Sequence, residues 1–179
     1  MQQNRKVRLT GSGGQGVILS SIILAEAALN EDNFVVQSQS YGPEARGGMC
    51  KAEVIVGKEE IDFPKIEQPD VLLALSQQSV DNYCKQACED CVIIADSSLD
   101  IPKCKAKTIA IPIIETAQDK LKNSITANVV ALGAINEIAG IVEEDSLEKA
   151  VLKYVPHSAG ELNKAALHEG KVLAEEVHV

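Results

Sequence analysis

Short apolar runs rich in β-branched residues recur along the first two thirds of the chain, and they predict strands. Most of these runs are bounded by Gly, Pro, Asp or Ser, which favour turns at strand ends. Helix-length segments at 14–30 and 77–89 alternate with them, as is typical of βαβ units around a largely parallel sheet. The predicted strands span residues 7–9, 34–37, 52–56, 71–75, 92–95 and 108–111.

The connections between these runs predict the fold class. Only residues 38–50 separate the second strand from the third, so we expect a mixed sheet with one antiparallel pair. From residue 113 onward the apolar period becomes helical, and 179 residues suit one domain. The pattern therefore predicts a single α/β domain over 1–179: a three-layer sandwich with a mostly parallel, mixed sheet of about six strands, a Rossmann-like first βα unit and C-terminal helices.

Polar positions within the helical region mark boundaries and one candidate contact. Residues 145–148 and 158–161 match the capping box, in which a cap side chain and an acid three residues later bond each other's backbone amides. Pro156 predicts the end of the helix that begins at the first box. A helix over 126–139 carries Asn128 on its apolar face. Because a buried amide needs partners, Asn128 is either a local cap or a ligand contact.

Charge and composition narrow the classes of partner. The chain has 26 acidic and 17 basic residues and a formal net charge of −9. Its basic residues are scattered among acids, which argues against nucleic acid. The longest apolar stretch, 16–29, is too short for a membrane span of about 20 residues. Because the first six residues are polar and no cleavage site follows, we expect a cytoplasmic protein without a membrane span.

The five cysteines raise the question of an iron–sulfur cluster. Cys84-x3-Cys88-x2-Cys91 has a spacing that also occurs in cluster loops. Cys84 and Cys88 share a helix face with Val80, however, and Cys91 opens a buried strand. Cluster ligands normally sit on an irregular, glycine-rich loop, and no such loop lies here, so we predict core cysteines in a reducing compartment.

The first candidate site is the glycine-rich turn Gly11-Ser12-Gly13-Gly14-Gln15-Gly16, which fits G-x-G-x-x-G between a strand and a helix. Glycines there let an anion approach the free amides at the helix start. A dinucleotide site also needs an acid at the end of the second strand, and residues 37–40 are Gln, Ser, Gln and Ser. The alternative is that the glycines serve only the close packing of helix on strand.

The second candidate site is the loop 40–48, Ser-Tyr-Gly-Pro-Glu-Ala-Arg-Gly-Gly. Its Arg46 offers a bidentate fork for a carboxylate or phosphate, and the alternative is an ion pair with Glu44 or Glu53. Asp96 ends the fifth strand at the same edge, either as a cap for the next element or in a catalytic role. No complete nucleophile or acid–base set is evident, which favours a binding or shaping subunit over a self-sufficient enzyme.

These motifs resemble the gamma subunit of the 2-oxoacid:ferredoxin oxidoreductases, in the pyruvate/ketoisovalerate oxidoreductase catalytic-domain family. The resemblance rests on the glycine turn 11–17, the loop 40–48, Asp70-Val-Leu-Leu-Ala74 and Asn128-Val-Val-Ala-Leu-Gly-Ala134, in order along nearly the whole chain. Ala45 occupies a position where the pyruvate branch commonly has a second arginine, so the chain looks more like the 2-oxoglutarate branch.

The resemblance implies a reaction carried out by a complex. A 2-oxoacid and coenzyme A would give an acyl-CoA, carbon dioxide and two electrons for ferredoxin or a related acceptor. Thiamine diphosphate would be held by alpha and beta subunits and iron–sulfur clusters by partner polypeptides, with a ferredoxin-like delta subunit as a further candidate partner. Thiamine supplies the carbanion chemistry, while protein supplies orientation and electrostatics.

The same resemblance implies which residues face cofactor, substrate or partner subunits. No residue is assigned to catalysis, and Arg46 is the candidate for contact with the 2-oxoacid carboxylate or coenzyme A phosphates. Three alternatives remain: a pyruvate-type gamma subunit, a free-standing nucleotide-binding module and a purely structural subunit. The candidate binding residues are Gly11, Gly13, Gly14, Gln15, Gly16, Tyr41, Gly42, Pro43, Glu44, Arg46, Gly47 and Asn128.

Overall fold

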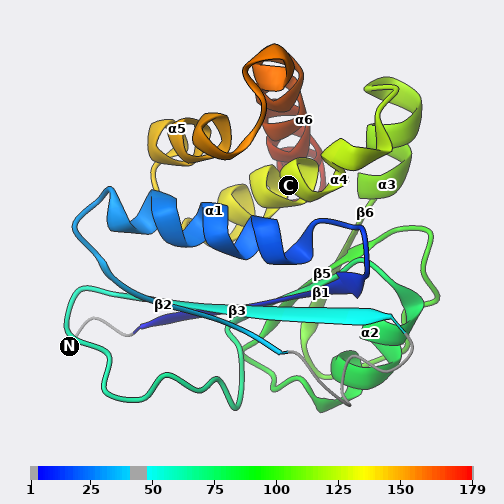
Figure 1. Cartoon of the computed structure of the whole chain (residues 1–179). Helices are drawn as coiled ribbons and strands as arrows, with labels where there is room; N and C mark the ends of the chain where they lie inside the picture. The colour runs from blue at the N-terminus through cyan, green and yellow to red at the C-terminus, as the bar shows by residue number, and fades with distance from the viewer. Residues whose placement is uncertain (1–3, 41–47, 179) are drawn as a thin grey trace.

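Six strands form one mixed sheet in the computed structural model of the chain, which describes residues 4–40 and 48–178 (Figure 1). Their order across the sheet is β2-β3-β1-β4-β5-β6. All six occur where the apolar runs predict them, although β1 and β3 are longer than expected. The strands are β1 (Arg5–Ser12), β2 (Phe34–Gln39), β3 (Met49–Gly57), β4 (Val71–Ala74), β5 (Val92–Asp96) and β6 (Lys107–Ile111).

The position of β3 differs from the expectation. β3 pairs antiparallel with β2, as predicted, but it also pairs antiparallel with β1, from Arg5 opposite Val56 to Ser12 opposite Met49. The sheet therefore contains two antiparallel pairs rather than one. The crossover through the first helix leaves one strand position between β1 and β2. The next strand, β3, runs back along the sheet and occupies that position. On its other side β1 pairs in parallel with β4, and β5 and β6 continue in parallel.

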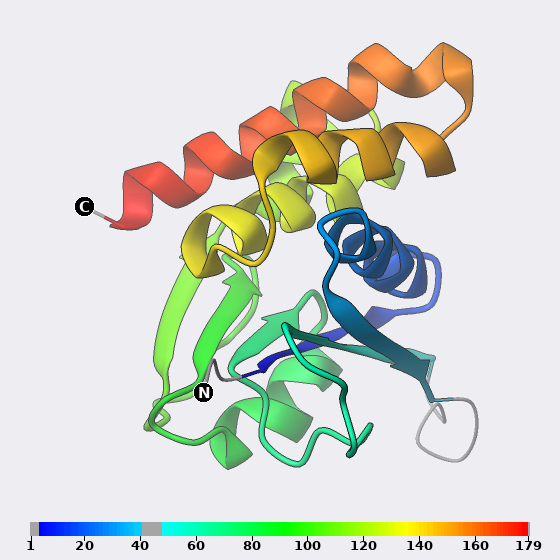
Figure 2. The same ribbon diagram turned by 90° about the vertical axis from the view of Figure 1, so that its left-hand side faces the viewer.

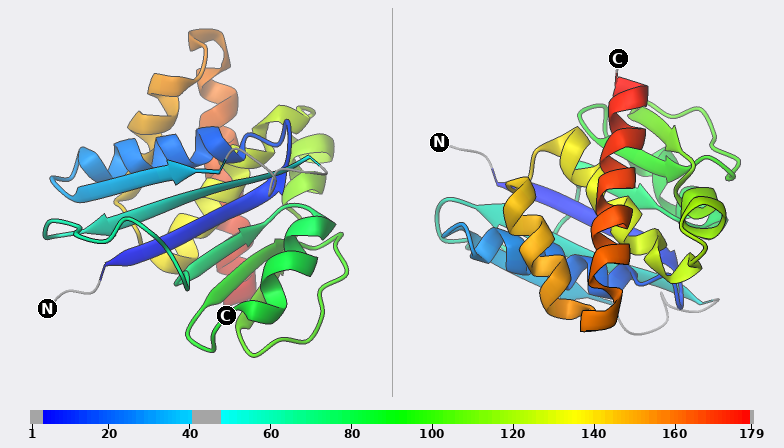
Figure 3. Two further views of the ribbon diagram at one scale, coloured as in Figure 1. Left: turned by 60° about the horizontal axis from the view of Figure 1, so that its bottom comes forward. Right: turned by 90° about the horizontal axis from the view of Figure 1, so that it is seen from above.

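Helices cover the two faces of the sheet unequally. On one face α1 (Val17–Leu29) and α4 (Ala127–Ala139) lie against the sheet, and α5 (Glu144–Tyr154) and α6 (Gly160–His178) lie over them (Figure 2). On the other face α2 (Gln77–Tyr83) and the short η2 (Cys84–Gln86) pack against β4 and β5, and α2 also contacts β1 (Figure 3). The α/β fold with helices on both faces is confirmed. No helix in the described part of the chain is long and apolar enough to cross a bilayer.

Short helical turns complete the chain between β6 and the last helix. They are α3 (Ile113–Glu115), η3 (Thr116–Lys120), η4 (Ser124–Thr126) and η5 (His157–Ala159).

The two capping boxes are not formed at the predicted positions. α5 begins at Glu144 after an N-cap residue, Glu143, that makes no side-chain cap bond, so Asp145 lies inside the first turn. There its charge favours the positive end of the helix dipole without capping an amide. α6 begins at Gly160, after the η5 turn. The predicted end at Pro156 is confirmed, because α5 stops at Tyr154.

Two apolar clusters hold the layers together. The larger one lies between the sheet and α1 and α4, and it contains Leu9, Leu24, Leu73 and Leu132. The smaller one, under α2, contains Cys84 and Cys91, both fully buried. Burial raises the pKa of Cys84 to about 11 and that of Cys91 to about 12. These protonated thiols behave as small apolar side chains, as predicted for Cys84 from its helix face and for Cys91 from the apolar run that it opens.

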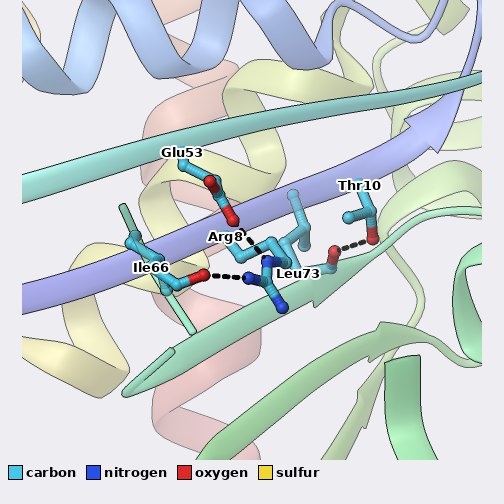
Figure 4. A network of polar contacts seen from close by, with 5 residues as sticks. All are labelled: Arg8, Thr10, Glu53, Ile66 and Leu73. Atoms are coloured by element: carbon cyan, nitrogen blue, oxygen red, sulfur yellow. Dashed lines mark hydrogen bonds and ion pairs between the residues drawn. The ribbon is translucent and has the colours of Figure 1, made fainter. Parts of the chain in front are cut away.

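A polar network centred on Arg8 of β1 fastens the sheet on the face that carries α2 (Figure 4). The Arg8 Nε atom lies 2.6 Å from Glu53 Oε1, and its Nη2 donates to the carbonyl of Ile66 at 2.8 Å. Arg8 also stacks over the ring of Tyr83 at 5.4 Å. The network thus ties β1 to β3, to the segment that leads into β4 and to α2.

Candidate functional site

The sheet order creates a topological switch point between β1 and β4. β1 continues into α1 on one face of the sheet, and β4 continues into α2 on the other face. Open α/β sheets bind ligands outside the carboxyl ends of their strands at such a point. The glycine turn 11–16 follows the end of β1 and therefore lies at this edge.

The backbone of this turn requires glycine at two positions. Gly14 and Gly16 have φ angles of 89° and 69°, a left-handed conformation that side chains disfavour. Gly16 is the N-cap residue of α1, and no side chain of residues 4–40 or 48–178 caps this helix start. The first amides of α1 are therefore available to an anion or a carbonyl oxygen.

The two glycine-bearing loops meet at this edge. The amide of Gly13 donates to the carbonyl of Gly48 at 2.7 Å, at the point where the second loop enters β3. The sequence places each loop after a strand, but the contact between them depends on β3 lying next to β1. The reversed β3 thus brings the end of the loop 40–48 beside the turn 11–16.

Asn128 stands over the start of α1. It is the second residue of α4 and only 4% exposed. A Cβ atom at Gly16 would lie 2.7 Å from Asn128 Nδ2, so the carboxamide presses against the N-cap of α1. Within residues 4–40 and 48–178 this carboxamide has no hydrogen-bond partner. Such a group meets a ligand or water.

The two alternatives for Asn128 are thereby separated. The N-cap residue of α4 is Thr126, and the preceding turn is capped by Asn123, whose side chain accepts from the amide of Ile125 at 3.1 Å. Asn128 is therefore no local cap, and its contact with a ligand stays a prediction.

Gln15 and Gly11 have internal structural roles, whereas the sequence analysis names both only as candidate binding residues. Gln15 Oε1 accepts from the amide of Ser12 at 2.6 Å, and Nε2 donates to the carbonyl of Leu75 at 2.9 Å. A Cβ atom at Gly11 would lie 2.7 Å from that Oε1. Gly11 thus makes room for the Gln15 side chain.

The other residues considered at this edge have internal roles. Gln37 Nε2 donates to Ser21 Oγ at 2.9 Å, so the end of β2 offers this amide to α1. Asp96 is 1% exposed; its Oδ1 accepts from the amide of Ser98 and its Oδ2 from the amide of Ile114, at 2.8 Å. Asp96 therefore caps the turn after β6, as one of its two interpretations predicted.

Most of the second loop lies outside the described residues. This applies to Tyr41, Gly42, Pro43, Glu44, Arg46 and Gly47. Both interpretations of Arg46 therefore stay open; of its two expected ion-pair partners, Glu53 is described and pairs with Arg8.

A groove of about 1100 Å³ lies at the opposite edge of the sheet, by the amino ends of β1, β4 and β5. Its lining includes Glu31, Asp70, Asp90, Glu137, Glu143 and Glu144, against Arg5 and Lys58. This excess of acids disfavours anionic ligands. An anion would therefore bind at the glycine edge rather than in the groove.

Comparison with known proteins finds similarity over almost the whole chain. Residues 6–172 match the family model described as pyruvate ferredoxin/flavodoxin oxidoreductase. The chain is 42% identical over 182 residues to the 2-oxoglutarate synthase subunit KorC of Methanocaldococcus jannaschii, covering 99% of this chain and 97% of that protein.

Two solved structures are similar over almost the whole chain. One is the gamma subunit of a keto/oxoacid ferredoxin oxidoreductase from Geobacter sulfurreducens, with 42% identity and a TM-score of 0.87, covering 96% of this chain and 99% of that one. The other is the pyruvate oxidoreductase subunit PORC of Thermotoga maritima, with 26% identity and a TM-score of 0.78, covering 94% and 96%.

Proposed function

The chain belongs to the pyruvate ferredoxin/flavodoxin oxidoreductase family, and we propose that it is the gamma subunit of a 2-oxoglutarate:ferredoxin oxidoreductase. The observation that carries this proposal is the 42% identity, over nearly the full length of both chains, to a 2-oxoglutarate synthase subunit. The pyruvate oxidoreductase subunit is less similar, at 26%, which supports the 2-oxoglutarate branch.

The complex would convert 2-oxoglutarate and coenzyme A to succinyl-CoA and carbon dioxide. Two electrons would pass to ferredoxin or a related acceptor, and one proton would be released. Thiamine diphosphate, held by alpha and beta subunits, supplies a stabilised carbanion when bound. Cys84 and Cys91 lie in an apolar cluster, and no three His, Cys, Asp or Glu side chains of the described residues gather as metal ligands, so we assign the iron–sulfur clusters to partner chains. The five free thiols fit a reducing, cytoplasmic location.

Within that complex this chain would bind and orient an anionic group at the glycine edge. The uncapped start of α1 offers backbone amides, and Asn128 adds a carboxamide without a partner in the described structure. Arg46, in the adjoining loop, would contribute positive charge toward the 2-oxoacid carboxylate or the phosphates of coenzyme A.

The test is to produce the chain together with its alpha and beta subunits and to purify the complex through a tag on this chain. Thiamine-dependent reduction of a viologen dye is then measured with coenzyme A and either 2-oxoglutarate or pyruvate. We expect activity only in the complex and a preference for 2-oxoglutarate. A preference for pyruvate would contradict the branch, and a chain that purifies alone with tightly bound nucleotide would contradict the subunit assignment.

Two substitutions test the glycine edge in the same assay. Arg46→Ala and Asn128→Ala should each raise an apparent KM for 2-oxoglutarate or coenzyme A by about tenfold, the effect of losing one good polar contact. Arg5→Ala is the matched control, because Arg5 is an exposed arginine at the opposite edge. Unchanged KM values in both test variants, with normal assembly, would favour a purely structural subunit.

A further inference from the structure

We propose that Gln15 is a positioning residue that closes the crevice between β1 and β4 and directs the ligand to the junction of α1 and α4. The inference rests on the proposed function, since the ligand is the one the glycine edge would bind in the complex. In this role Gln15 does not contact the ligand, and its side chain holds in place the backbone amides that do. We call the Gln15 carboxamide with its bonds to Ser12 and Leu75 the bracket.

The first step is the place of the Gln15 carboxamide in the sheet. The pairing of β1 with β4 ends with the amide of Leu75 donating to the carbonyl of Thr10 at 3.0 Å. Immediately beyond, the carboxamide lies between the amide of Ser12 and the carbonyl of Leu75, accepting from one and donating to the other. A side-chain amide thus supplies one further rung between two diverging strands, as a peptide group of a neighbouring strand would.

The second step is the space that the bracket occupies. The switch point is where open α/β sheets normally admit a ligand. Here the Gln15 side chain crosses it, in space that is open because residue 11 is glycine: a Cβ there would overlap Gln15 Oε1 and Val17 Cγ2. A ligand therefore cannot enter between Ser12 and Leu75 while the bracket is in place.

The third step is the direction that remains open. Past Gln15 the chain turns through Gly16 into α1, and the carboxamide of Asn128 lies against Gly16. The backbone amide of Gln15 also donates to the carbonyl of Ser12 at 3.2 Å, so both the backbone and the side chain of Gln15 hold the turn. The polar groups without a partner in the described structure, the first amides of α1 and the carboxamide of Asn128, consequently lie on the α4 side of the turn.

The bracket needs a donor and an acceptor in one side chain, and this suggests the variants. Gln15→Met keeps the length and fills the crevice but removes both bonds. Gln15→Glu keeps an acceptor for Ser12 but turns a carboxylate toward the carbonyl of Leu75. The matched control is Gln77→Met, because Gln77 makes the same kind of bracket elsewhere, accepting from the amide of Asp100 at 2.9 Å and donating to its carbonyl at 3.0 Å.

Two measurements on the complex test the proposal. Hydrogen exchange followed by mass spectrometry should show faster exchange at residues 12–16 in Gln15→Met and Gln15→Glu, by about tenfold for the loss of one bond. In the viologen assay the apparent KM for coenzyme A or 2-oxoglutarate should rise by a similar factor while kcat stays within twofold. Gln77→Met should change exchange only around residue 100 and leave both KM values unchanged.

Each result is decisive. Unchanged exchange at residues 12–16 in both Gln15 variants would overturn the bracket. Faster exchange with unchanged KM values, or with a lowered kcat alone, would overturn its effect on ligand placement. If the wild-type complex lacks 2-oxoacid activity, the proposed function fails, and the exchange comparison still decides whether Gln15 holds the turn.

Discussion

Gly133 of α4 and Gly170 of α6 each lie against the backbone of the other helix. A Cβ atom at Gly133 would overlap the carbonyl oxygen of Leu167, and one at Gly170 would overlap the carbonyl oxygen of Val130. The two glycines therefore let the helices cross at backbone contact, which fixes the depth at which α6 sits on α4. Because Asn128 is on α4, this crossing also supports the helix that carries it.

Alanine at either position should weaken the fold, although alanine favours a helix by about 1 kcal/mol over glycine. The overlap forces the helices apart, and we expect Gly133→Ala and Gly170→Ala each to lower the free energy of unfolding by about 1–3 kcal/mol in urea titrations. Gly160→Ala is the control, since a Cβ there would meet Leu152 at an ordinary 3.4 Å. Equal stability of all three variants would refute the close crossing.

Alanine variants of Gly16 and Gly14 distinguish the effect of backbone strain on stability from the effect of steric overlap. Both have left-handed φ angles, but a Cβ at Gly14 meets nothing within 4 Å, whereas one at Gly16 meets Asn128. We expect Gly14→Ala to lower the free energy of unfolding by about 1–2 kcal/mol and Gly16→Ala to lower it by about 1 kcal/mol more. Asn128→Ala should recover that difference in the Gly16→Ala background but not in the Gly14→Ala background. Chemical denaturation of the four variants measures this coupling.

The partly buried ion pair between Arg8 and Glu53 should stabilise the fold more than the exposed ion pairs do. Arg8→Met leaves Glu53, 12% exposed, without its partner, and we expect the free energy of unfolding to fall by about 2–4 kcal/mol. The double variant Arg8→Met/Glu53→Met should regain much of this loss, because no buried charge remains. Lys149→Ala breaks an i,i+4 pair whose side chains are 70% and 78% exposed, and it should leave the urea midpoint unchanged, because solvent screens such a pair.

The buried thiols predict a loss of stability at alkaline pH. Cys84 and Cys91 have folded pKa values of about 11 and 12, above an ordinary value near 9. Above pH 9 the unfolded chain therefore binds fewer protons than the folded one, and stability falls as the pH rises toward 12. The two thiols together contribute a slope of at most about 2.7 kcal/mol per pH unit. Urea titrations from pH 8 to 11 should show a shallower decline in Cys84→Ala/Cys91→Ala, and identical slopes would contradict the prediction.

Local patterns were sufficient to predict the elements but not the sheet order. The runs around Val54 and Leu73 are apolar enough to predict strands, yet nothing in them specifies that β3 inserts between β2 and β1. That order is set by long-range pairing and by the crossover through α1. The helix starts show the same limit, because Glu143 rather than Asp145 precedes α5 when packing decides the boundary.

The candidate site was predictable in composition and only partly in role. The glycine turn and Asn128 were recognisable from spacing and from the helical face, and the structure brings them together. The division of labour inside the turn was not recognisable, because Gln15 makes its bonds across the sheet to Leu75. A G-x-G-x-x-G pattern gives no information about which of its residues faces outward. Tyr41 to Gly47, including Arg46, stay a prediction from the sequence.

The central position of β1 has a consequence for how the chain acquires its structure. β1 is made first, but both of its neighbours come much later: Val7 pairs with Val54 on one side and with Val71 on the other. During synthesis the first strand therefore cannot pair on both sides until β4 has left the ribosome. Folding dominated by such distant pairings is slow and leaves apolar strands exposed. Newly made chains of this protein should depend on chaperones before partner subunits are available.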